Sequence, residues 1–91
     1  MKLTDIKMRF PSDETKLKAI ATLTFDDEFV IHDVKVIDSE GRLFVAMPSR
    51  RMPDGTYRDI AHPINRDARE KLESSVLGEY EKLISTESAI M

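Results

Sequence analysis

The sequence predicts an α+β fold, in which an antiparallel meander of four to five strands carries one C-terminal helix packed on it. Two observations lead to this prediction. Before residue 61, short stretches of alternating apolar and polar residues are separated by turn-forming residues, which is the pattern of a strand meander. After Asn65, one apolar stripe recurs at helical spacing, and such a stripe needs another layer of structure to cover it.

Three strands are expected in the first half of the chain. Residues 4–10 alternate apolar with charged side chains, as a strand with one solvated face does. Residues 16–25 place small alanines on their apolar face, which suggests that a helix packs closely there. Residues 29–37 form the third strand after an acidic turn. One face of this third strand is expected to carry Val30, His32, Val34 and Val36.

A fourth strand and a hairpin follow. Residues 43–47 are apolar at every position, so both faces of this strand are expected to be covered. Pro48 removes a backbone donor and ends the strand. Residues 52–56 form a turn, because Pro presets φ at one corner and Gly accepts a positive φ at the next. A short fifth strand over residues 57–60 then returns antiparallel.

Arginines gather at this hairpin. The antiparallel return brings Arg58 opposite Arg50 or Arg51, where like charges repel unless an anion lies between them. Residues 42–71 hold 7 Lys and Arg against 4 Asp and Glu, whereas the whole chain has a net charge of −3. Such a local basic surface suits contact with phosphate groups, although an ordinary solvated rim stays an open alternative. The candidate nucleic-acid-binding residues are Arg50, Arg51, Arg58, Arg66, Arg69 and Lys71.

One helix is predicted after the hairpin. Asn65 is a favoured N-cap, and Asp67 lies in the first turn, where the helix dipole favours an acid. The periodicity stops near Leu83, so we expect a single domain over residues 1–84 and a flexible tail over residues 85–91. The stripe expected to lie on the sheet consists of Ala68, Leu72, Val76, Tyr80 and Leu83.

The composition excludes several classes of function. The chain has no Cys, and its two His residues are not spaced as metal ligands. It carries no phosphate loop, nucleophile elbow or other catalytic motif, so we expect no enzyme and no cofactor. Neither an apolar leader nor a membrane span is visible, which favours the cytoplasm. Tyr57 and Phe44 offer aromatic faces to single-stranded bases, although aromatic residues in a sheet are more often core.

Four runs of the sequence are specific enough to suggest a family. They are AIA at residues 19–21, FDDEFVIHDVKVID at 25–38, LFVAMPSRR at 43–51 and PDGTYRDIAHPIN at 53–65. Together they resemble the SpoVG family of bacterial septation proteins, over roughly residues 3–83. The segments FVAMPS and RDIAHPIN carry most of the resemblance.

The resemblance implies a small cytoplasmic homodimer, joined through its sheet, that binds DNA and in some members RNA. It also implies an influence on division septum formation, sporulation and gene expression. By the resemblance, nucleic-acid contacts fall on Arg50 and Arg51 and on the helix start at Arg66, Arg69 and Lys71. The start of the helix departs from the family pattern, because members often have Ser and Thr there. An alternative is a protein-interaction module of the division or sporulation machinery, in which the basic surface meets an acidic partner and nucleic-acid contact is incidental.

Overall fold

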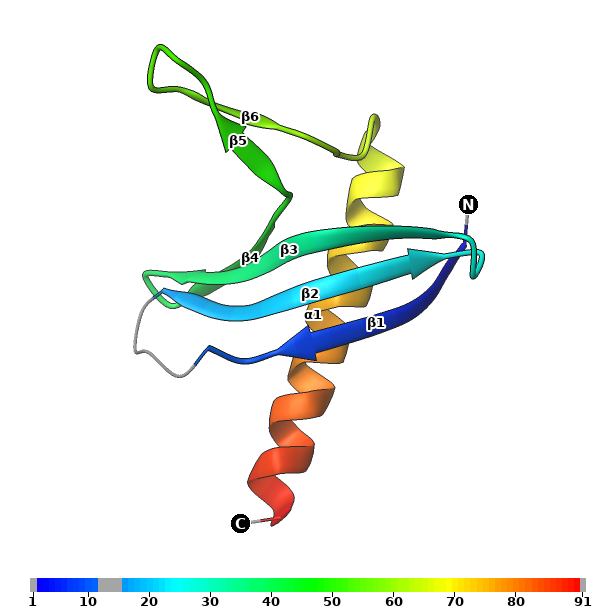
Figure 1. Ribbon diagram of the computed structural model, residues 1–91. Helices are drawn as coiled ribbons and strands as arrows, with labels where there is room; N and C mark the ends of the chain where they lie inside the picture. Colours follow the sequence, from blue (N-terminus) through cyan, green and yellow to red (C-terminus); the bar gives the residue numbers. More distant parts are fainter. Residues whose placement is uncertain (1, 12–15, 91) are drawn as a thin grey trace.

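The computed structural model describes residues 2–11 and 16–90 and contains one four-stranded antiparallel sheet, one two-stranded sheet and one helix (Figure 1). The main sheet has the strand order β1-β2-β3-β4, so each strand pairs with its neighbour in the chain. The predicted α+β fold is therefore confirmed. The elements are β1 (Leu3–Arg9), β2 (Leu17–Phe25), β3 (Phe29–Ser39), β4 (Arg42–Ala46), β5 (Ser49–Arg51), β6 (Tyr57–Asp59) and α1 (Arg66–Ile90).

The predicted sheet of four to five strands has four, because the hairpin after Pro48 forms a sheet of its own. Pro48 has no backbone donor to continue the ladder, and the chain turns away from the main sheet at this point. Figure 1 shows β5 and β6 standing apart from the four strands, with the turn at their far end. We call residues 49–59 the arm.

The core lies between one face of the main sheet and α1. Ala19, Ala21 and Leu23 from β2 are fully buried, and Val76 from the helix lies in the same cluster. The small alanines leave room for a close layer above them, as the sequence predicts. Figure 1 shows α1 crossing the strands steeply on this face. The helix contacts β4, β3 and β1, so it spans the sheet from edge to edge.

A bulge in β3 changes which of its side chains face the core. Between the partners of Ala21 and Leu23, β3 uses one residue more than β2. Asp33 lies in this bulge with φ of 62°, a left-handed conformation that Asp tolerates better than most residues. The extra residue puts Ile31 against the core and leaves Val30 44% exposed. The single face predicted for Val30, His32, Val34 and Val36 is therefore wrong, because simple alternation does not foresee a bulge.

The start of the helix follows its predicted signals. The Ala68 N–H donates to Asn65 Oδ1 at 2.8 Å, so Asn65 is the N-cap and α1 begins at Arg66. Val76 and Tyr80 are buried, and Leu72 packs against them. The helix continues to Ile90, so residues 85–90 belong to it in place of the predicted tail. Among the described residues, no helix has the length and apolar character that a membrane span needs.

Over residues 2–11 and 16–90, no helix covers the opposite face of the main sheet. Register pairs and alternation place Ile20, Ile37, Phe44 and Ala46 together on this face. Phe44 is 42% exposed, whereas Val45 on the other face of β4 is buried. The prediction that both faces of the fourth strand are covered is therefore wrong for a single chain, because the described residues form one helix and that helix covers one face.

Leu23→Ala should lower the free energy of unfolding by about 2–5 kcal/mol, because it empties a fully buried position at the centre of the core. Ile64→Ala is the matched control, since Ile64 is 88% exposed and its loss should cost less than about 0.5 kcal/mol. Urea unfolding followed by circular dichroism measures both variants. Similar losses in the two would contradict the assigned core.

Candidate nucleic-acid interface

The arm is closed by the predicted turn. The Met52 N–H donates to Thr56 O at 2.7 Å, and the Gly55 N–H donates to Met52 O at 3.0 Å. Gly55 has φ of 90°, a conformation that favours glycine. The turn predicted for residues 52–56 is therefore confirmed, and it sets the register of the two strands behind it.

The carboxylate of Asp54 is engaged inside this turn. Its Oδ1 accepts hydrogen bonds from the Thr56 hydroxyl at 2.6 Å and from the Thr56 N–H at 3.0 Å. The hydroxyl bond is the larger cause, and together the two bonds hold the pKa of Asp54 below its ordinary value. Because the folded pKa is lowered, this contribution to stability is present at neutral pH and is lost as the pH falls through the folded pKa.

Arginines face each other across the arm. The register pairs Arg50 with Arg58 and Arg51 with Tyr57, which confirms the predicted position of Arg58. Directly opposed residues in an antiparallel pair have Cβ atoms about 5 Å apart, so the first pair sets two like charges side by side. All of these side chains are exposed. In the part of the chain that the structure describes, no carboxylate forms an ion pair with Arg50, Arg51 or Arg58.

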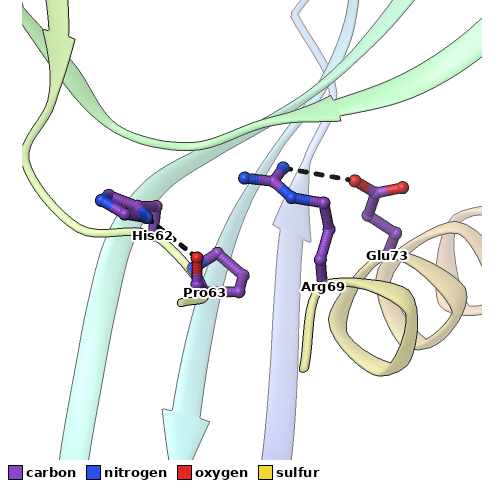
Figure 2. A network of polar contacts seen from close by, with 4 residues as sticks. All are labelled: His62, Pro63, Arg69 and Glu73. Atoms are coloured by element: carbon purple, nitrogen blue, oxygen red, sulfur yellow. Dashed lines mark hydrogen bonds and ion pairs between the residues drawn. The ribbon is translucent and has the colours of Figure 1, made fainter. Parts of the chain in front are cut away.

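The first turns of α1 carry the remaining predicted residues. Arg66 begins the helix, and Arg69 lies one turn later. Arg69 Nη1 lies 3.5 Å from Glu73 Oε1, an ion pair that Figure 2 shows beside His62 and Pro63. Lys71 is exposed in the second turn. The acid at Asp67 occupies the first turn, as predicted.

An open hollow of about 490 Å³ joins the arm to the helix start. Of the six predicted residues, the structure brings Arg58 and Arg69 together at this hollow. Arg50 and Arg51 lie on the neighbouring strand of the arm, while Arg66 and Lys71 do not line the hollow. The full lining consists of Tyr57, Arg58, Asp59, His62 and Arg69.

Three lining residues, Tyr57, Asp59 and His62, are not among the six predicted site residues. The His62 Nδ1 lies 2.9 Å from Pro63 O, a backbone acceptor (Figure 2). Because a carbonyl oxygen can only accept, Nδ1 is the donor in this contact. One signal in the sequence is that Asp59 ends the second strand of the hairpin and His62 follows it closely, just before the N-cap Asn65.

Comparison with known proteins relates the chain to one family. The family model described as SpoVG matches residues 1–82. A protein of Clostridium kluyveri is 53% identical over 88 residues, which cover 97% of this chain and 92% of that protein. A protein of Thermoanaerobacter sp. is 53% identical over 89 residues, covering 98% and 97%. One of Clostridium acetobutylicum is 54% identical over 87 residues, covering 96% and 92%. Each of the three is named "Putative septation protein SpoVG".

Thr56→Ala should raise the pKa of Asp54 toward its ordinary value, because it removes the hydroxyl that donates to the carboxylate. The rise should be partial, since the backbone N–H of residue 56 still donates to the same oxygen. An NMR titration of the Asp54 carboxyl carbon measures the change. An unchanged pKa would show that the hydroxyl does not hold the charged form.

Proposed function

We propose, because this chain belongs to the SpoVG family, that it is a dimeric, site-preferring regulator that binds DNA and also RNA. By this proposal it acts in the cytoplasm and influences division septum formation, sporulation and gene expression. The observation that carries the proposal is the opposition of Arg50 and Arg58 on the projecting arm, with no carboxylate partner among the described residues.

The arm has the properties of a phosphate-binding element. Two guanidinium groups held side by side repel each other, and a bound anion turns that repulsion into attraction to both. Arginine presents a planar fork of donors that matches two oxygens of a phosphate group. The exposed Arg51 lies next to this pair on the same strand, so the arm offers three such forks. We propose that Arg50, Arg51 and Arg58 hold the nucleic-acid backbone.

The start of α1 extends this surface. The first backbone N–H groups of a helix and its dipole favour an anion at that end. Arg66 begins α1, Arg69 lies one turn later, and Lys71 lies in the second turn. The net charge of −3 does not oppose this proposal, because phosphate binding depends on the local field. The arm and the helix start would bind neighbouring phosphates of one strand or groove.

A second copy of the chain would cover the exposed face of the main sheet. Ile20, Ile37, Phe44 and Ala46 lie there around the exposed Lys35, opposite the helix. A chain this short buries a small core, and pairing two such faces would enlarge the core. We propose that the dimer forms through this face. Two arms on one dimer double the phosphate contacts, which makes binding steeply dependent on salt.

The double variant Arg50→Ala/Arg51→Ala should bind mixed-sequence DNA at least tenfold more weakly than the wild type, with a shallower dependence of affinity on salt concentration. The reason is that a complex with fewer phosphate contacts releases fewer counterions when it forms. Fluorescence anisotropy at two salt concentrations measures both effects.

The matched control is Lys2→Ala/Lys16→Ala, which removes two exposed charges at positions just before β1 and β2, outside the strands that form the proposed dimer face. This control should keep nearly all of the affinity. If the two double variants lose affinity equally, or if the wild type shows no preference among duplexes and no salt dependence, the arm is not the nucleic-acid site. A protein partner would then be the better explanation of the arginines.

Phe44→Glu should shift the protein from dimer to monomer, because it places a charge in the middle of the proposed contact face. Phe29→Glu is the control, since Phe29 is more exposed than Phe44 but lies at the turn between β2 and β3. Sedimentation velocity at micromolar concentration separates the two states. A dimer that survives Phe44→Glu, or a wild-type monomer, would contradict the proposed interface.

A further inference from the structure

The hollow between the arm and the start of α1 differs in chemistry from a simple phosphate site. We propose that it receives one unpaired guanine base of a bound single strand. This inference rests on the proposed nucleic-acid function and names the part of the ligand that the hollow reads. The five residues that line the hollow are Tyr57, Arg58, Asp59, His62 and Arg69.

A carboxylate in the hollow argues against phosphate as its occupant. Asp59 forms no ion pair with a described residue, although Arg58 and Arg69 line the same hollow. An unneutralised carboxylate repels a phosphate group but accepts hydrogen bonds from N–H donors. A nucleobase edge carries such donors and is itself uncharged. The mixed lining of cations and acceptors therefore fits a base better than the backbone.

Tyr57 supplies a surface for the base to stack on. Its side chain is 69% exposed, and it belongs to the arm, away from the core cluster. Base stacking on an aromatic ring is available to any base that is not held in a duplex. Tyr57 and Asp59 are two positions apart in β6, so their side chains leave the same face of the strand, about 7 Å apart along it. A base stacked on Tyr57 would thus present its edge near Asp59.

The arrangement of donors and acceptors selects guanine. The guanine edge used in base pairing carries two adjacent N–H donors, at N1 and N2, which a carboxylate accepts together. Guanine also carries two acceptors, O6 and N7, which an arginine fork recognises. Asp59 supplies the carboxylate, and Arg69 supplies the fork. Adenine lacks the N1 donor. The base must be unpaired, because cytosine occupies N1 and N2 in a duplex.

Two local contacts orient the side chains of Arg69 and His62. The ion pair with Glu73 uses Nη1 of Arg69, so the guanidinium has further donors on its other nitrogens. His62 Nδ1 donates to Pro63 O, and this contact holds the ring in place where it lines the hollow (Figure 2).

The experiment compares short oligothymidines that carry one central guanine, inosine or adenine, each made in deoxyribose and ribose form. Inosine lacks the amino group and keeps the rest of the guanine edge. Anisotropy titration should show guanine bound at least about fivefold more tightly than inosine or adenine. The sugar form with the larger preference identifies the better ligand. Tyr57→Leu should weaken binding of all three oligonucleotides.

Asp59→Asn should abolish the preference for guanine, because an amide cannot accept from two adjacent donors. Asp67→Asn is the matched control, since it also removes one exposed carboxylate, from the first turn of α1, but does not line the hollow. Both variants lose one negative charge and should gain general affinity alike, while only Asp67→Asn keeps the preference. A wild type that binds all three bases equally would overturn the guanine site alone. A wild type that binds no oligonucleotide and no duplex would overturn the proposed function as well.

Discussion

The apolar contact between α1 and one face of the sheet determines where every other part of the molecule lies. Ala19 and Ala21 allow this close approach, and Val76 fills the space above them. Since α1 begins directly after the segment that returns from the arm, docking the helix also fixes where the arm ends. Charge and burial are thereby separated along the chain. The sheet and helix bury the apolar residues, and the arm and helix start expose the basic ones.

The arm keeps its shape with little apolar burial. Its two strands carry exposed residues only, and a proline precedes β5 where the chain leaves the main sheet. Its stability therefore depends on the backbone ladder and on the turn that Asp54 and Thr56 close. The Asp54 carboxylate accepts hydrogen bonds inside its own turn, whereas the Asp59 carboxylate, at the hollow, forms no ion pair with a described residue. These two carboxylates on one hairpin consequently have different chemistry.

Local signals predicted much of this molecule. The cap at Asn65, the turn at Gly55 and the opposition of Arg50 and Arg58 each depend on residues close in sequence, and all three are confirmed. The bulge at Asp33 depends on how two strands register, which alternation cannot reveal. The hollow depends on the direction in which the arm leaves the sheet. Asp59 and His62 therefore belong to the site because of the tertiary structure. The end of the helix was not predicted, because no local stop signal marks it.

The order of the strands has a consequence for how the chain folds during its synthesis. Because every pair in the main sheet joins consecutive strands, each hairpin closes over a short loop, and short loops close quickly. The helix contacts both edge strands and leaves the ribosome after all of the strands. Until α1 has been synthesised, both faces of a nearly complete sheet are therefore exposed to water. Helix docking is the step during which a newly made chain is most exposed to aggregation.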